Sequence, residues 1–336
     1  MTAAMREVLT AQLIERLRAA GLDPQEVTRV VSAALDEDLP GRADVTTEAT
    51  VPAGTQSTAH LTARADGVVA GLAVAETVFR VASARGVPPA GSATSAADGA
   101  AQPFGIIYHR SDGDRVRRDD VLFTVTGPAR SLLAAERTAL NLACHLSGIA
   151  TLTRRWVDEV AGTGAAVRDT RKTLPGLRAL QKYAVRCGGG ANHRMSLSDE
   201  ALVKDNHVAA AGGVAAAFAA VSKAVAGLPI EVECDTLAQV KEAAEAGATL
   251  ILLDNFAAAD LAAAVALVAG RARLEASGGL TLERARAVAA TGVDYLAVGA
   301  LTHSAPALDL ALDLAPGPGS VAHESANHTS SGRSCC

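Results

Sequence analysis

The chain has 336 residues, a formal net charge of -5 at pH 7, 49% hydrophobic and 20% charged residues, which excludes a largely disordered chain. Aromatic residues make up only 3%. An acidic balance with so few stacking side chains argues against a nucleic-acid-binding protein.

The five cysteines are odd in number and form no CxxC pair, so we expect reduced thiols and a cytoplasmic protein without a disulfide framework. The first twenty residues mix arginine and glutamate in a helical pattern that does not fit a signal peptide. The longest apolar run, 208–221, is shorter than the ~20 residues of a membrane span. That run therefore predicts no membrane partner. The eight histidines form no zinc-like group with cysteine, so we expect no structural metal.

The first half of the chain predicts two helices and then several strands. Asp23 and Pro24 suit the cap and the first position of the second helix. Strand-like stretches follow, and a turn signal at 111–114 separates the last two. These stretches are 57–71, 106–109 and 121–125.

Two other segments of this half have a simple pattern. Residues 91–103 are small, polar and low in complexity, which predicts a flexible surface insertion. From Pro128 a helical pattern runs past Thr151 and includes Arg137, which by itself is most simply a surface cation.

The second half repeats a strand followed by a helix. Apolar strands end near Glu233, Asp254, Ser277 and Gly299, which are 21, 23 and 22 residues apart. The repeat predicts a parallel sheet. The expected strands are 230–233, 250–253, 274–276 and 293–298, and the expected helices between them are 236–246, 257–269 and 282–290.

This repeat favours a (β/α) barrel, because no GxGxxG follows a strand as a dinucleotide fold would require. Barrel active sites lie at the carboxyl ends of the strands. There, Glu233 and Asp254 could hold a divalent cation, and the glycine turns could bind phosphate. Taken one at a time, each of these residues could equally be a helix cap or a turn residue.

The segment 168–194, RDTRKTLPGLRALQKYAVRCGGGANHR, carries seven arginine or lysine residues in an acidic chain. Its middle predicts a helix, and the cations Arg178 and Lys182, with Arg186, fit a solvated helical face. Nucleic-acid binding is a poor alternative, since Tyr183 is the segment's only aromatic residue.

The remaining cations of this segment lie on loops. Arg171 and Lys172 stand at a strand-to-loop transition, and three glycines precede His193 and Arg194. Lys204 follows ten residues later. Arginine forks bind carboxylates and lysine serves phosphates, so the segment predicts a pocket for a small polyanion.

Together with ALVKDNHV, EVECD, LLDN, SGG and VGALTHS, this segment resembles quinolinate phosphoribosyltransferase. The resemblance also covers EDLPGRADVTTEAT, DGVVAGLAVAETVF and GPARSLLAAERTALNLACHLSGIATLTR, and it runs from about Val27 to Leu314. There are three departures: the 91–103 insertion is longer than expected, the tail 315–336 is extra, and Ser196 stands where the family usually has glycine.

The resemblance implies an α/β protein in which an N-terminal α/β sandwich, 1–140, precedes an open seven-stranded (β/α) barrel, 141–304. Residues 305–314 would rejoin the sandwich, and 315–336 would be a disordered tail. It further implies that quinolinate and phosphoribosyl pyrophosphate react to nicotinate mononucleotide, pyrophosphate and carbon dioxide, in de novo NAD synthesis. Magnesium dependence and a homodimer with shared active sites are also implied.

The resemblance assigns site residues by substrate. Arg171, Arg194 and His193 would bind the two carboxylates of quinolinate. Thr170, with Arg137 of the neighbouring subunit, would lie beside quinolinate.

The resemblance assigns the other substrate to the remaining residues. Lys172 and Lys204 would bind phosphate and pyrophosphate, and Glu233 and Asp254 would bind magnesium and ribose. The 5-phosphate would be bound by Ser277, Gly278, Gly279 and Gly299.

Two other functions stay open. A related phosphoribosyltransferase could act on a different acidic ring. A catalytically silent metabolite-binding regulator is a second alternative, although such a protein would not need both Glu233 and Asp254. Nucleic-acid binding is the weakest of the alternatives.

Overall fold

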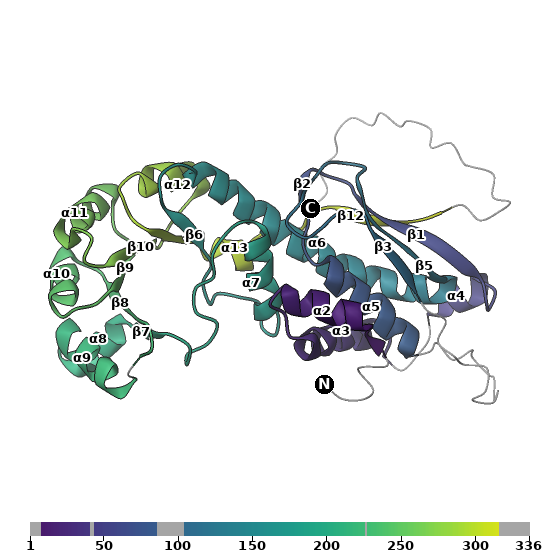
Figure 1. Ribbon diagram of the computed structural model, residues 1–336, viewed down its shortest axis with the longest axis horizontal. Helices are drawn as coiled ribbons and strands as arrows, with labels where there is room; N and C mark the ends of the chain where they lie inside the picture. Colours follow the sequence, from purple (N-terminus) through teal and green to yellow (C-terminus); the bar gives the residue numbers. More distant parts are fainter. Residues whose placement is uncertain (1–7, 41–43, 86–103, 226, 316–336) are drawn as a thin grey trace.

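The structure is a computed structural model that describes residues 8–40, 44–85, 104–225 and 227–315. The predicted insertion 91–103 lies outside the described residues, and so does the predicted tail apart from Ala315. Two parts of the chain stand side by side, joined by one long helix (Figure 1).

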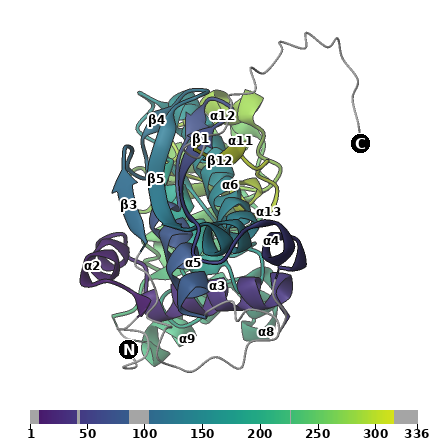
Figure 2. The same cartoon turned by 90° about the vertical axis from the view of Figure 1, so that its right-hand side faces the viewer.

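The N-terminal part is a four-stranded antiparallel sheet with helices packed against it. Its strand order is β12-β1-β5-β3, so the chain returns at its end to pair β12 with β1. Figure 2 looks onto this part, with β1, β5 and β12 side by side. The sheet strands are β1 (Gln56–Ala63), β3 (Gly105–Tyr108), β5 (Val121–Pro128) and β12 (Leu310–Leu314); β2 (Gly67–Val68) pairs with β4 (Arg115–Val116); the helices are α2 (Ala11–Ala19), α3 (Pro24–Asp38), α4 (Val45–Thr50) and α5 (Leu72–Ala84).

Helix α6 (Ala129–Val160) connects the two parts without a break. It packs against α5 and the N-terminal sheet, and also against β6 and α7 (Arg178–Cys187). The predicted boundary between residues 140 and 141 falls inside this helix. The helix therefore belongs to both parts and packs against each of them.

The C-terminal part is a curved parallel sheet with helices on its outer side (Figure 1). The predicted alternation of strands and helices is confirmed. The strand order is β6-β11-β10-β9-β8-β7. The strands are β6 (Ala166–Arg168), β7 (Ala201–Val203), β8 (Ile230–Cys234), β9 (Leu250–Asp254), β10 (Arg273–Ser277) and β11 (Tyr295–Ala297); the further helices are α8 (Asp205–Ala211), α9 (Val214–Ala224), α10 (Leu237–Glu245), α11 (Ala258–Val268), α12 (Leu282–Ala289) and α13 (Ala300–His303).

The prediction of seven strands is wrong in number, because this sheet has six among the described residues. At the seventh position, Ala191 forms a single parallel bridge with Arg168. The chain leaves the strand path after this residue, since the backbone of His193 is bonded by the side chains of Asp169 and Lys182 and not by a neighbouring strand. The barrel is therefore open beside the basic segment.

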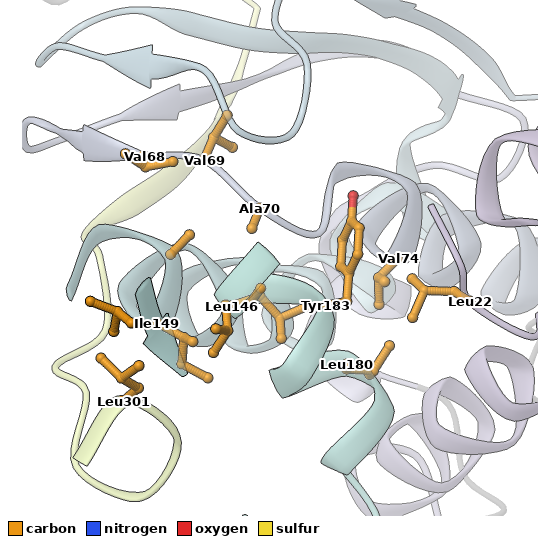
Figure 3. Packing of buried hydrophobic residues seen from close by; sticks show 14 of the residues in the cluster. Leu22, Val68, Val69, Ala70, Val74, Leu146, Ile149, Leu180, Tyr183 and Leu301 are labelled. Carbon is orange, nitrogen blue, oxygen red and sulfur yellow. The ribbon is translucent and has the colours of Figure 1, made fainter. Parts of the chain in front are cut away.

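A shared hydrophobic core fastens the basic helix α7 to the rest of the molecule. Leu180 and Tyr183 of α7 are buried against Leu146 and Ile149 of α6 and against N-terminal residues that include Val74 (Figure 3). One face of α7 is thereby fixed, so its polar side chains on the other faces have a firm base.

Among the described residues, no single helix is long and apolar enough to span a membrane, although the bent pair α8 and α9 together has the required length and composition.

Candidate active site

A cavity of about 370 Å³ opens at the carboxyl ends of the parallel strands. Nine of the predicted site residues line it, and Leu202, Leu252, Glu275 and Ala297 complete the wall. The nine are Thr170, Arg171, Lys172, His193, Arg194, Lys204, Glu233, Asp254 and Ser277.

One wall of the cavity comes directly from strand ends. Side chains alternate between the two faces of a strand, and Glu233, Asp254 and Ser277 all point to the inner face. Ser277 and Asp254 are register partners, and Glu233 lies opposite Leu252 on the same strand as Asp254. Asn255 Nδ2 donates to Asp254 Oδ2 at 2.7 Å and so orients that carboxylate.

Lys204 stands between β7 and α8 at the edge of this wall. Its ammonium donates to Glu233 Oε2 at 3.2 Å, and its backbone N–H donates to His207 Nδ1 at 2.9 Å. The side chain is half exposed, so the ion pair with Glu233 is accessible to an incoming anion.

The opposite wall is cationic. Arg171 lies beside Arg194 and Arg178, and burial together with these two like charges lowers the pKa of its guanidinium. Arg171 Nε is buried and has no hydrogen-bond partner among the described residues. An N–H donor left unpaired in a crowd of cations is a binding group for an anion.

The prediction that Lys182 is solvated is wrong. It is completely buried, and its ammonium lies 2.5 Å from Asp169 Oδ1. Arg178, also expected to be solvated, is half-buried and donates to Thr173 Oγ1 and to the carbonyl of Met195. The segment's charge therefore serves two purposes, since α7 uses its cations to hold loops while the loops present theirs to the cavity.

His193 is buried and uses both ring nitrogens within the protein. Its Nδ1 accepts from the Arg194 N–H at 2.7 Å, so the ring proton lies on Nε2, which is 2.7 Å from Glu231 Oε2. Burial lowers the pKa of His193, which agrees with a neutral ring. Glu275 Oε1 is 3.6 Å from the same Nε2.

Beneath His193 lies an acidic cluster that the sequence analysis missed: Glu200, Glu231 and Glu275, facing Arg168 and Arg194. Arg168 donates to Glu275 Oε2. Three carboxyl groups face two guanidinium groups, and burial raises the pKa of Glu231 and of Glu275 to about 7. Burial therefore favours a protonated carboxyl group in this cluster.

A period of two along the strands could have indicated this cluster. Glu231 lies two residues before Glu233, and Glu275 lies two before Ser277, so each shares the inner face with a predicted site residue. Asp169, next to Thr170, had no comparable sequence signal, because its partners come from α7 and from the loop after it.

The predicted glycines are near the cavity without lining it. Gly278 has φ +87°, and a Cβ there would lie 2.2 Å from Asn255 Oδ1, the side chain that orients Asp254. Gly279 has φ +57° but open space around it. A Cβ on Gly299 would lie 3.1 Å from Lys172 Cδ, so the glycine leaves room for this lysine.

Two further residues from the sequence analysis lie apart from the cavity wall. Arg137 is exposed on α6 and does not line the cavity. Ser196 is not among the described residues with positive φ, and its N–H and hydroxyl both bond Asp199 Oδ1. The freedom of a glycine is therefore not required at that position.

Comparison with known proteins covers both parts of the chain. The family model for the C-terminal domain of quinolinate phosphoribosyl transferase matches residues 149–313, and the model for the N-terminal domain matches residues 44–147. A nicotinate-nucleotide pyrophosphorylase (carboxylating) of Mycobacterium leprae is 52% identical over 291 residues, which are 84% of this chain and 95% of the relative. Quinolinate phosphoribosyltransferase (decarboxylating) 1b of Nicotiana tabacum is 40% identical over 304 residues, which are 85% and 81%.

Two solved structures agree with the fold. NadC from Streptococcus pyogenes is 38% identical and has a TM-score of 0.79, over 88% of this chain and 98% of its own. The nicotinate-nucleotide pyrophosphorylase from Francisella tularensis is 35% identical with a TM-score of 0.78, over 87% and 96%.

Proposed function

The chain belongs to the quinolinate phosphoribosyltransferase family, and from this premise we propose how its cavity divides the two substrates. The enzyme transfers the phosphoribosyl group of phosphoribosyl pyrophosphate to quinolinate with decarboxylation. The products are nicotinate mononucleotide, pyrophosphate and carbon dioxide, in NAD biosynthesis. The observation that best supports the division is the unpaired, buried Nε of Arg171 among like charges, opposite an acidic wall.

Quinolinate is a planar dicarboxylate, and it belongs on the cationic wall. Arg171 and Arg194 supply guanidinium forks for its two carboxylates, and Thr170 lies beside them. His193 is neutral with its proton directed to Glu231, so its role is to shape the pocket and to hold a proton close to the ring. This assignment differs from a charged histidine that binds a carboxylate directly.

Phosphoribosyl pyrophosphate belongs at the strand ends. Lys172 and Lys204 serve phosphate oxygens as point charges. Glu233 and Asp254 face the ribose and pyrophosphate, since these acids would repel a dicarboxylate. Two glycine turns complete the 5-phosphate site with backbone N–H groups. One comprises Ser277 at the end of β10 with Gly278 and Gly279 after it, and the other contains Gly299 after β11.

Glu233 and Asp254 fit a magnesium ion by the chemistry of their donors. Both are carboxylates on adjacent strands, and both line the same cavity. A bound ion would supply charge neutralisation for the leaving pyrophosphate. The chain's own contribution at this wall is to orient the acids, through Asn255 on Asp254 and Lys204 on Glu233.

The reaction needs positioning and charge stabilisation without a protein nucleophile. The bond from C1 of the ribose to pyrophosphate breaks, and the pyridine nitrogen forms a bond to that carbon. The ring is then a pyridinium, and its positive nitrogen stabilises the electron pair that stays on C2 when the 2-carboxylate leaves as carbon dioxide. The C2 carbon finally takes up one proton. Lys172 and Lys204 stabilise the pyrophosphate, and the arginines hold the ring in place throughout.

The site is completed by a second copy of the chain in this proposal. Arg137 is exposed on α6 and lies outside the cavity of its own chain, so we assign it to the cavity of a partner in a symmetric homodimer. Subunit exchange between inactive Arg137→Ala and Lys204→Ala variants tests the assignment. Random pairing makes about half of the dimers mixed, each with one intact site, so activity should return to roughly a quarter of wild type. Demonstrated exchange without recovery would reject the shared site.

Product analysis tests the function itself. Quinolinate, phosphoribosyl pyrophosphate and magnesium should yield nicotinate mononucleotide and pyrophosphate in equal amounts, and nicotinate in place of quinolinate should yield far less. A preference for nicotinate would favour the related transferase that acts on a different acidic ring.

The three described cysteines, Cys144, Cys187 and Cys234, are free thiols, and on that ground we assign the reaction to the cytoplasm.

A further inference from the structure

We propose that Asp169 and Lys182 are positioning residues, a buried ion pair that fixes the two quinolinate-binding loops relative to each other. The inference rests on the proposed function for the identity of the ligand. Neither residue lines the cavity, so neither touches substrate. Their effect on the reaction passes through the loops that carry Arg171 and Arg194.

Asp169 joins the two loops directly. It lies just after β6, two residues before Arg171. Its Oδ1 accepts from the His193 N–H at 2.9 Å, and its Oδ2 accepts from Asn192 Nδ2 at 2.5 Å. One side chain at the root of the first loop therefore holds two consecutive residues of the second loop.

Lys182 closes the arrangement from helix α7. Its ammonium donates to Asp169 Oδ1 at 2.5 Å and to the carbonyl of His193 at 2.7 Å. Both backbone groups of His193 are thus bonded by the two members of one ion pair. Because Arg194 is the next residue, the fixed backbone of His193 also fixes where Arg194 begins.

The ion pair is fully buried, and its contacts leave little freedom. Asp169 and Lys182 are each 0% exposed. Burial raises the pKa of Asp169 and lowers the pKa of Lys182, while the charge of each partner opposes the shift of the other. Buried pairs often contribute no more stability than well-packed apolar residues, so stability alone does not explain why this pair stands here.

Neighbouring side chains of α7 brace the same two loops, which supports a positioning role. Arg178 bonds Thr173 in the first loop and Met195 in the second. Gln181 Oε1 accepts from the Leu174 N–H at 2.9 Å, and Arg186 donates to Asn192 Oδ1 at 2.6 Å. The Lys182–Asp169 pair is the buried centre of this bracing, and α7 itself is fixed by the core in Figure 3.

The test compares Lys182→Met with the double variant Asp169→Asn/Lys182→Met. The single variant removes the bond to the His193 carbonyl and leaves a buried carboxyl group without its cation. The double variant removes both charges, while the amide oxygen of the introduced asparagine would still accept from the His193 N–H. Lys241→Met is the matched control, because Lys241 is an exposed lysine of α10 whose only ion pair within the described part of the chain is with Glu245.

We expect the KM for quinolinate to rise about tenfold or more in both variants, while the KM for phosphoribosyl pyrophosphate stays within about twofold. The double variant should regain thermal stability relative to the single one without regaining its quinolinate KM. The amide hydrogens of His193 and Arg194 should also exchange faster in both variants, with those of β9 unchanged. Hydrogen exchange needs no substrate, so this result stands apart from the proposed function.

Two outcomes would overturn the inference. One is a double variant with a wild-type quinolinate KM, because positioning would then not depend on the pair. The other is equal rises in both KM values together with faster exchange throughout the sheet, which would show a general loss of structure. If wild type itself fails to convert quinolinate, the proposed function fails, and the exchange rates alone decide the inference.

Discussion

The two walls of the cavity are built in different ways. Glu233, Asp254 and Ser277 project from the ends of neighbouring strands, so the sheet ladder places them. Arg171 and Arg194 stand on loops after a three-residue strand and a single bridge, so side-chain bonds from α7 and from Asp169 place them. The strand wall gains precision from the backbone, whereas the loop wall depends on buried polar side chains.

The difference teaches where each kind of mutation acts. A polar substitution on the strand wall should change the reaction rate without moving the neighbouring side chains. A substitution behind the loop wall should move the substrate-binding arginines, although the substituted residue itself does not touch substrate. The predictions below test this separation, starting with the largest expected effect.

Asp254→Asn tests whether the strand wall acts on the ribose-pyrophosphate alone. We expect turnover to fall by about 10³-fold, which corresponds to about 4 kcal/mol of transition-state stabilisation. Quinolinate binding, measured by calorimetry, should stay within about twofold. Asp260→Asn, at an exposed position of α11, is the control and should match wild type. A loss of quinolinate affinity at unchanged fold would show that the walls are not separate.

Glu275→Gln tests the acidic cluster beneath His193. Burial raises the pKa of Glu275 to about 7 from 4.5, so the folded chain keeps a proton that the unfolded chain releases. The associated stability is present below about pH 4.5 and is lost as pH rises through about 7. The glutamine side chain does not titrate, so the free energy of unfolding of the variant should fall less than that of wild type as pH rises across this range.

The measurement is the free energy of unfolding of both proteins in urea between pH 5 and pH 8. The difference between variant and wild type should move in the variant's favour as pH rises, by up to about 3 kcal/mol. Parallel pH profiles for the two proteins would contradict a protonated carboxyl group in the cluster.

Arg171→Lys tests the loop wall at the substrate itself. Lysine keeps the charge but loses the planar fork, so quinolinate affinity should fall about 30-fold, or about 2 kcal/mol. The KM for phosphoribosyl pyrophosphate should not change. Arg155→Lys, an exposed substitution on α6, serves as the control. Equal weakening of both substrates would mean that Arg171 serves both walls.

Gly278→Ala and Gly279→Ala form the most subtle comparison. Both positions have positive φ, so each substitution should cost about 1 kcal/mol of stability in backbone strain. At Gly278 the new Cβ would also displace Asn255 and with it Asp254, so turnover should fall about tenfold there and little at Gly279. Stability from thermal melts and turnover measured together would decide this; equal turnover in the two variants would argue against a role for Asn255.

The same contrast explains what could be predicted from sequence. The strand–helix repeat placed Glu233, Asp254 and Ser277 at one edge, because strand periodicity is a local pattern. The loop cations were found by residue type and by family resemblance. The prediction that Lys182 is solvated was wrong. Helical spacing shows which residues share a face, but it does not show that this face meets a buried Asp169 from another element. The seventh strand came from the family resemblance, and the structure differs there because side chains of Lys182 and Asp169 bond the backbone of His193 in place of a strand ladder.

Labelled quinolinate tests the central claim most directly, namely that the loop wall holds a dicarboxylate whose 2-carboxylate is lost only after transfer. Quinolinate labelled separately at the 2-carboxyl and the 3-carboxyl is incubated with the enzyme and magnesium, with and without phosphoribosyl pyrophosphate. The account predicts one labelled carbon dioxide per pyrophosphate from the 2-carboxyl, none from the 3-carboxyl, and none without phosphoribosyl pyrophosphate. Release from the 3-carboxyl, release without phosphoribosyl pyrophosphate, or pyrophosphate formation without carbon dioxide would contradict it.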